Sequence, residues 1–209
     1  MSTPTRWQTE GGPDRSQWYV DHFRKLAAEG ADLVGEARLM DALLPPRSRV
    51  LDAGCGPGRV GAELHRRGHQ VVGVDADEIL IAAALEDHPG PTFLVADLAA
   101  LDLPSAGIVE RFAGAVLAGN VMTYLAPDTA VDLLRRVASH VVPDGPVVAG
   151  FSLDHGYPLD DFDRDLDDAG LTLEHRFSTW DLRPWTVDWD YAVSVLRVPG
   201  QPGNDPSEA

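Results

Sequence analysis

Three glycines at alternate positions, Gly54, Gly56 and Gly58, follow an apolar segment that ends in Asp52 and Ala53. Glycines lack a Cβ, so they let the backbone turn sharply and let a ligand approach the main chain. A helix that begins directly after them presents free N–H groups and the positive end of its dipole, which suit a carboxylate or a phosphate. The spacing therefore predicts a ligand-binding turn between a strand and a helix.

Asp52 helps to choose between two kinds of ligand. Its carboxylate is expected inside an apolar strand, where burial is costly unless it meets a hydrogen-bond donor or a ligand amine. Gly56-x-Gly58-x-x-Gly61, with Asp75 ~20 residues on, also matches the dinucleotide fingerprint. However, a dinucleotide presents a pyrophosphate at this point and gains nothing from an acid. A nucleoside with an amino-acid tail, as in S-adenosylmethionine, fits both ends, and NAD(P) is the alternative.

Apolar strands and amphipathic helices alternate around this turn, which favours a parallel sheet with helices on both faces. Two β-rich segments with a short connection end the pattern and predict an antiparallel hairpin. We therefore expect an α/β fold: a doubly wound, seven-stranded sheet, mainly parallel, with an antiparallel C-terminal hairpin. The strands are predicted at 49–53, 70–74, 92–96, 112–118, 147–151, 171–181 and 187–198. The helices are predicted at 14–29, 32–44, 60–67, 78–86, 129–140 and 159–169.

Asp52-x-Gly54-x-Gly56-x-Gly58 resembles motif I of the class I S-adenosylmethionine-dependent methyltransferases, which have a Rossmann-like fold. The similarity continues in order through about residues 30–198. It includes Asp75 after the second strand, Ala96-Asp97-Leu98 after the third, Ala118-Gly119-Asn120 after the fourth and Pro143-Asp144-Gly145 before the fifth. The resemblance implies S-adenosylmethionine as cofactor and a methyltransferase domain over residues 46–198. Residues 1–45 are expected to form an N-terminal helical lid, and residues 199–209, which are rich in Pro, Gly and polar residues, a disordered tail. Residues 1–12 are also expected to be a loose end.

The resemblance further implies a role for each matching position. The backbone of Gly54, Cys55 and Gly56 would hold the methionine part, and Asp52 would face its ammonium group. After the second strand, Asp75 would accept from the ribose hydroxyls and Ala76 would lie beside the adenine. After the third strand, Asp97 would accept from the adenine amino group and Leu98 would pack nearby. Gly119 and Asn120, at the end of the fourth strand, would lie near the sulfonium. Asp75 and Asp97 also suit helix capping, and Asn120 also suits a plain loop. The implied cofactor-binding set is Asp52, Gly54, Cys55, Gly56, Gly58, Asp75, Ala76, Asp97, Leu98, Gly119 and Asn120.

Catalytic residues are harder to predict for this reaction. Holding the acceptor in line with a methyl group supplies up to ~7–11 kcal/mol, so a base is needed mainly for neutral hydroxyls or protonated amines. His155, which follows Asp154, is the first candidate for that base, and Tyr19 is the second; a solvated loop histidine is the alternative for His155. Cys55 lacks a paired base and is interpreted as a small filler.

Composition limits the partners. The 209 residues include 17 Lys+Arg and 33 Asp+Glu, for a net charge of −16, and Lys25 is the one lysine. A nucleic-acid partner is not expected because it requires a basic surface. A single cysteine and no His/Cys cluster predict no metal site, and the absence of a long apolar run predicts no membrane segment. We expect a cytoplasmic enzyme that methylates O or N of a small molecule. A non-catalytic cofactor-binding module is a further alternative, and the oligomeric state stays open.

Overall fold

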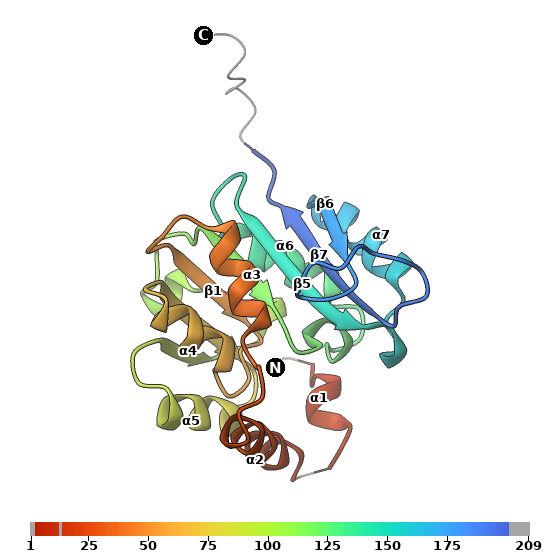
Figure 1. The fold of residues 1–209 in the computed structure, drawn as a ribbon. Coiled ribbons are helices and arrows are strands. Elements are labelled where there is room, and N and C mark those ends of the chain that lie inside the picture. The colour runs from red at the N-terminus through yellow and green to blue at the C-terminus, as the bar shows by residue number, and fades with distance from the viewer. Residues whose placement is uncertain (1–2, 13, 201–209) are drawn as a thin grey trace.

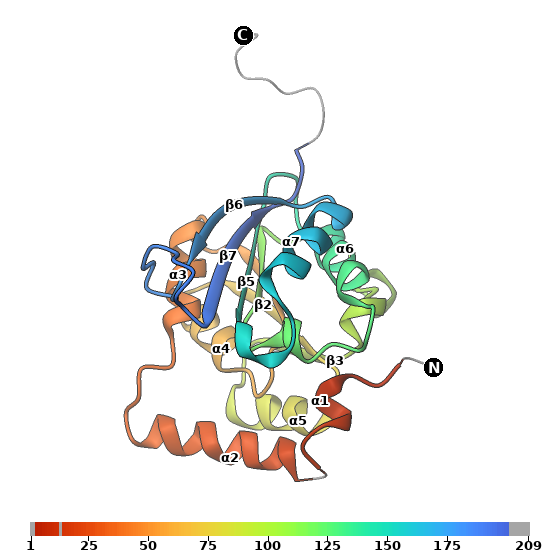
Figure 2. The same cartoon turned by 90° about the vertical axis from the view of Figure 1, so that its right-hand side faces the viewer.

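The computed structural model describes residues 3–12 and 14–200, and it contains a seven-stranded sheet with helices on both faces (Figures 1 and 2). The strand order is β3-β2-β1-β4-β5-β7-β6. β7 is antiparallel to β5 and β6, whereas the other neighbouring pairs are parallel. This confirms the predicted fold class. The strands are β1 (Arg49–Ala53), β2 (Gln70–Asp75), β3 (Thr92–Val95), β4 (Gly114–Leu117), β5 (Pro146–Ser152), β6 (Thr172–Phe177) and β7 (Tyr191–Arg197).

The helices form two layers, which Figure 2 shows on opposite sides of the sheet. α3 and α4 pack on one face, and α6 and α7 pack on the other. α2 lies along α5 below the carboxyl ends of the parallel strands (Figure 1). The helices are α1 (Arg6–Thr9), α2 (Arg15–Ala28), α3 (Gly35–Leu43), α4 (Arg59–Arg66), α5 (Glu78–Asp87), α6 (Ala130–His140) and α7 (Leu159–Ala169), and short 3-10 turns include η1 (Leu98–Ala100), η3 (Val121–Thr123) and η4 (Leu153–His155).

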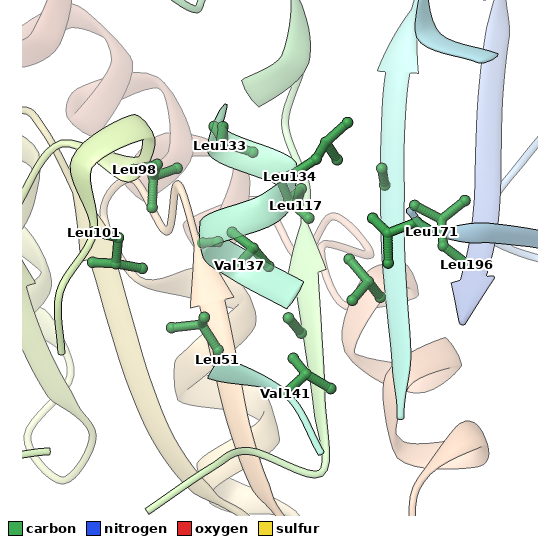
Figure 3. Packing of buried hydrophobic residues seen from close by; sticks show 14 of the residues in the cluster. Leu51, Leu98, Leu101, Leu117, Leu133, Leu134, Val137, Val141, Leu171 and Leu196 are labelled. Atoms are coloured by element: carbon green, nitrogen blue, oxygen red, sulfur yellow. The ribbon is translucent and has the colours of Figure 1, made fainter. Parts of the chain in front are cut away.

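The central strands bury both faces because their side chains alternate between two apolar clusters. In β1, Leu51 contacts the α6–α7 side and Val50 contacts the α3–α4 side. Figure 3 shows the larger cluster, in which Leu133, Leu134 and Val137 of α6 pack against the sheet. This core fixes the carboxyl ends of β1, β2 and β4 relative to one another.

Several segments differ from the predicted ones. Among the strands, β4 spans Gly114–Leu117 rather than 112–118, and β7 begins at Tyr191 rather than at 187. Residues 1–12 are predicted as loose, but Thr5 caps the short helix α1 with a capping box. The helix predicted from Asp32 begins at Gly35, because the Asp32 carboxylate instead binds Arg38. β6 ends at Phe177 rather than at 181, because the next residues fold into a turn that the buried Ser178 closes through bonds to the carbonyls of Arg183 and Pro184.

The predicted disordered tail lies, from residue 201 onward, outside the described residues. Within residues 3–12 and 14–200 no helix is both long and apolar enough to cross a bilayer.

Candidate cofactor-binding site

A cavity lies at the carboxyl ends of β1, β2 and β4, where α1 and α2 also contribute to its lining. Its walls come from the glycine turn, the ends of the parallel strands, the segment after β4 and the N-terminal helices. The lining residues are Thr5, Trp7, Tyr19, Asp52, Gly54, Cys55, Gly56, Pro57, Arg59, Val60, Asp75, Ala76, Leu80, Asp97, Leu98, Ala118, Gly119, Val121, Tyr124 and Leu125.

Asp52 brings a buried carboxyl group to the cavity. Its side chain is on the α4 face of β1, and the residue is 1% exposed. Oδ2 accepts the backbone N–H of Gly61 at 2.9 Å, and no other group in the described chain bonds to this carboxyl. Burial raises the pKa of Asp52 to about 7, although the nearby Arg59 opposes this shift. The carboxyl group is therefore costly to ionise alone and favours a cationic ligand group.

Asp75, the last residue of β2, holds the glycine turn. Its Oδ2 accepts the Gly56 N–H at 2.9 Å, and its Oδ1 accepts the Asp77 N–H at 3.0 Å. Burial raises the pKa of Asp75 to about 6, and these two backbone donors partly offset the shift. The capping role considered for Asp75 belongs to Asp77, whose Oδ1 accepts from Ile79 and Leu80 at the start of α5. Asp75 therefore remains available to a ligand on the cavity side.

The glycines of the turn serve different purposes. Gly56 has φ +54°, and an added Cβ would lie 3.7 Å from Cε1 of Tyr19, so its missing side chain leaves space on the cavity side. Gly58 has φ +85°, and an added Cβ would lie 2.8 Å from Cζ of Phe93, in the protein interior. Gly58 is not among the lining residues. The structure thus assigns Gly58 to packing between the turn and β3, whereas the sequence predicts it to bind the cofactor.

The residues predicted to contact the adenine, Ala76, Asp97 and Leu98, all line this cavity. The Asp97 carboxylate accepts the Ala99 N–H at 3.0 Å and caps η1, so the capping role considered for it is present. One of its oxygens, Oδ2, makes no bond to the described residues. Cys55 is buried among Ile81, Ala84 and Phe93, as expected of a small filler, and burial raises the pKa of its thiol.

The two site residues predicted at the end of β4, Gly119 and Asn120, lie in different places. Gly119 lines the cavity, and an added Cβ would lie 3.4 Å from the Tyr19 hydroxyl. Asn120 is not a lining residue; its Oδ1 accepts the Ser152 N–H at 2.8 Å and ties the end of β4 to the end of β5. Tyr19 therefore reaches from α2 across the turn toward Gly119. Burial raises the pKa of its phenol, which is neutral near pH 7.

The structure does not bring His155 to the cavity. It lies exposed on η4, with its ring 6.1 Å from the Tyr124 ring, and it is not a lining residue. Its carbonyl accepts from Arg6 at 3.1 Å. The other side chains after β5 turn elsewhere as well: the Tyr157 hydroxyl donates to Asp165. In this arrangement Tyr19 is the predicted catalytic candidate that lies at the site.

The sequence did not single out the buried ion pair of Arg59 and Glu36 for this site. Arg59 Nη1 donates to Glu36 Oε2 at 2.8 Å and to the Leu33 carbonyl at 2.8 Å. The Arg59 guanidinium also lies 5.2 Å from the Phe23 ring. Arg59 thus links the start of α4 to α2 and α3 beside the cavity.

These residues fit S-adenosylmethionine. The buried carboxyl of Asp52 suits an ammonium group, and Asp75 and Asp97 can accept from ribose and adenine. The positive-φ glycines leave space against the backbone of the turn. No group of three or more His, Cys, Asp or Glu side chains that could hold a metal ion occurs among the described residues.

Comparisons with known proteins relate this chain to methyltransferases. A family model described as a methyltransferase domain matches residues 50–145. A solved TehB-like SAM-dependent methyltransferase from Corynebacterium glutamicum is 39% identical and superimposes with a TM-score of 0.83, over 90% of this chain and all of that one.

Two curated relatives are O-methyltransferases by name. A ubiquinone biosynthesis O-methyltransferase from Bradyrhizobium diazoefficiens is 38% identical over 100 residues, which are 48% of this chain and 38% of that protein. A magnesium-protoporphyrin O-methyltransferase from Rhodobacter capsulatus is 34% identical over 134 residues, which are 59% of this chain and 56% of that one. The similarity thus spans well under two thirds of either curated protein.

The solved relative matches nearly the whole chain, and β7 runs antiparallel beside β5, unlike the strands of a purely parallel dinucleotide-binding sheet. These findings decide against the NAD(P)-dependent oxidoreductase that the Gly56-x-Gly58-x-x-Gly61 pattern left open. The chain belongs to the family of class I S-adenosylmethionine-dependent methyltransferases.

Proposed function

We propose that this protein is an enzyme that transfers the methyl group of S-adenosylmethionine to an oxygen or nitrogen of a small molecule. The observation that carries the proposal is the cavity in which Asp52, Asp75 and Asp97 meet the glycine turn at one edge of the sheet. The names of the curated relatives, a ubiquinone biosynthesis and a magnesium-protoporphyrin O-methyltransferase, favour oxygen over nitrogen. The cofactor supplies an activated methyl on a sulfonium, which departs as a neutral thioether.

In this proposal the residues of the turn bind the amino-acid end. The Asp52 carboxylate pairs with the ammonium group, which lowers the cost of its ionisation in the interior. The backbone of Gly54, Cys55 and Gly56 borders the methionine chain. Asp75 accepts from the ribose hydroxyls while it keeps its bonds to the Gly56 and Asp77 amides. Binding is therefore stronger when both carboxyl groups are ionised.

The remaining predicted residues take the adenine and the reacting end. Ala76 and Leu98 pack against the base, and the free oxygen of Asp97 accepts from its amino group. Gly119 borders the sulfonium. Asn120 supports the site without contacting the cofactor, because the bond that it accepts from the Ser152 N–H fixes the end of β4.

For catalysis we favour Tyr19 as a residue that orients the acceptor. A phenol whose pKa burial has raised is a hydrogen-bond donor at neutral pH and a poor base. Its position near Gly119 suits a bond to an acceptor oxygen that lies in line with the methyl group. His155 would need a movement of η4 to act as a base. Alignment then supplies most of the rate enhancement.

Calorimetry with S-adenosylhomocysteine and with NADH provides the first test. We expect micromolar or tighter binding of the thioether and no binding of NADH; the reverse result would refute the proposal. Transfer of a labelled methyl group from the cofactor to pools of small hydroxylated, carboxylated and amino compounds then tests turnover. Binding without transfer to any pool would favour the non-catalytic module.

The segment over residues 1–45 is proposed as a lid, as the sequence predicts. α2 contributes Tyr19 to the cavity and packs on α5. The acceptor would enter between this segment and the loops after β4 and β5. The acidic surface of the chain, with a net charge of −16, favours neutral or cationic acceptors over anionic ones.

A further inference from the structure

Residues 5–12 and 14–16 include two lining residues of the cavity, Thr5 and Trp7, and are bound at several points to the rest of the molecule. The Trp7 N–H donates to the Tyr124 carbonyl at 3.3 Å. Arg6 Nη1 donates to the carbonyls of Thr123 at 2.9 Å and His155 at 3.1 Å. These contacts hold α1 against the loops that follow β4 and β5. We refer to residues 5–12 and 14–16 as the strap.

Trp7 also joins the strap to the opposite wall. Its indole Nε1–H donates to Asp77 Oδ2 at 2.8 Å, and the Ser16 hydroxyl donates to the same oxygen. The other oxygen of Asp77 caps α5, and the backbone N–H of Asp77 donates to Asp75. A single residue, Asp77, therefore connects Trp7 to the carboxylate that faces the ribose in the proposed function.

The indole ring stands among aromatic groups. Trp7 meets Tyr19 edge to face at 5.2 Å between ring centroids and Tyr124 at 5.6 Å. The Arg15 guanidinium lies 4.0 Å from the Trp7 ring and 4.4 Å from the Tyr124 ring, where a cation is attracted to the ring faces. Trp7 and Thr5 line the cavity together with Asp97 and Leu98, the residues of its adenine side.

We propose that Trp7 is a further cofactor-binding residue, which closes the nucleoside half of the cavity, and that the strap must detach before the cofactor exchanges. The proposal rests on the proposed function, because it names an additional part of the same site. Aromatic side chains stack on the face of any nucleobase, and the loss of one such contact weakens binding by about 10- to 100-fold. The strap contacts lie at or near the surface and are partly exposed, so they can open without unfolding the sheet.

Equilibrium binding of S-adenosylhomocysteine tests the contact. We expect Trp7→Ala to raise the dissociation constant by about 10- to 100-fold. Trp7→Phe keeps a ring but loses the bond to Asp77, so a smaller rise of about 3- to 10-fold is expected. Trp18→Ala is the matched control, because Trp18 lies on the next helix, is 62% exposed and stacks on His22. It should bind as the unaltered protein does.

The rate of release tests the strap. Arg15 is not a lining residue, so Arg15→Gln should loosen the strap without removing a cofactor contact. We expect about a 3- to 10-fold faster dissociation of S-adenosylhomocysteine, measured by stopped-flow displacement. Lys25→Gln, on the exposed side of α2, is the control and should leave the rate unchanged. Hydrogen exchange of the strap amides should slow on binding in the unaltered protein and slow less in Arg15→Gln.

The outcomes separate the two proposals. If the unaltered protein binds no S-adenosylhomocysteine, the proposed function fails and this inference fails with it. If the unaltered protein binds and a folded Trp7→Ala variant binds equally well, only the role of Trp7 is refuted. Equal release rates for Arg15→Gln and the unaltered protein, with no change of exchange in the strap, would refute the gating role. Far-ultraviolet circular dichroism and unfolding midpoints establish that each variant is folded.

Discussion

The two halves of the sheet use acidic residues in opposite ways. In the half that contains β3, β2, β1 and β4, the carboxyl groups of Asp52 and Asp75 are turned into the cavity and have raised pKa values of about 7 and about 6. In the half that contains β5, β7 and β6, acidic side chains are numerous but lie on the surface, above all on α7. The same residue type thus lines a cavity in one half and the protein surface in the other.

The two halves also differ in their match to the methyltransferase-domain family model, which covers the strands of the first half and none of the second. The family model ends at residue 145, directly before β5. The covered half builds the proposed cofactor site, whereas β5 to β6 complete the core through Phe151 and Phe162. Binding and stability should therefore respond separately to substitutions in the two halves, and the following variants measure that separation.

The largest effect is expected in the second half. Phe162 of α7 is fully buried and contacts the Phe151 ring edge to face at 5.0 Å. Phe162→Ala removes this packing and leaves a cavity, so the free energy of unfolding should fall by ~3–5 kcal/mol. Urea denaturation measures the loss. At low temperature, where the variant is folded, its affinity for S-adenosylhomocysteine should equal that of the unaltered protein; a large change in affinity would break the separation of the halves.

A pH-dependent effect is expected at Asp52. Its pKa is about 7 in the ligand-free folded chain and 3.8 as the ordinary value, so the folded state binds more protons between these limits. The unaltered protein therefore loses stability as pH rises from about 4 to 7. The amide introduced by Asp52→Asn does not titrate, and its oxygen still accepts the Gly61 N–H. We expect Asp52→Asn to gain ~2–3 kcal/mol relative to the unaltered protein between pH 5 and pH 8.

Denaturation midpoints at several pH values measure this gain. The same variant should bind S-adenosylhomocysteine more weakly, because the amide carries no charge for the ammonium group. A stability difference that is flat across this pH range would show that Asp52 does not titrate in the interior. Stability gained together with affinity lost is the result expected of a functional residue.

A loss of affinity is expected at Asp75. Asp75→Ala removes the acceptor for the ribose hydroxyls and the anchor of the Gly56 amide, so binding of S-adenosylhomocysteine should weaken by about 10- to 100-fold. Calorimetry measures the change. Asp77→Ala is an informative companion, because it removes the α5 cap and the bond to Trp7 but leaves the Asp75 carboxyl in place. If Asp75→Ala binds normally, its carboxyl only supports the turn.

Local sequence patterns predicted the fold and the turn because the relevant information is local. Short apolar runs specify the parallel strands, alternating apolar residues specify the hairpin, and the spacing from Asp52 to Gly58 specifies the turn. The same reasoning assigned Gly58 to the ligand, because a glycine that avoids Phe93 cannot be told from one that faces a cavity until the packing is known. Asp77 rather than Asp75 proved to be the cap for a similar reason: both precede the helix by a few residues.

Residues brought to the site from a distance were not predictable in this way. Trp7 lies in a polar segment without periodicity, and it is held by contacts with residues distant in the sequence, such as Tyr124 and Asp77. The pairing of Glu36 with Arg59 joins two helices that are separated by a strand, and each residue alone looks like an ordinary surface charge. Such pairs follow from the three-dimensional arrangement, and a single sequence does not specify them.

The smallest effect is expected on the surface of the second half. Asp167 lies exposed in the last turn of α7, where a negative charge faces the negative end of the helix dipole. Asp167→Asn should therefore change the free energy of unfolding by less than about 0.5 kcal/mol, in the stabilising direction, and should leave the affinity for S-adenosylhomocysteine unchanged. Asp167→Asn and Asp52→Asn both replace a carboxyl group by an amide, the first on the surface and the second in the interior. Comparing these two variants therefore isolates the effect of burial. A pH-dependent stability gain in Asp167→Asn as large as in Asp52→Asn would mean that net charge, and not the buried position of Asp52, governs the response.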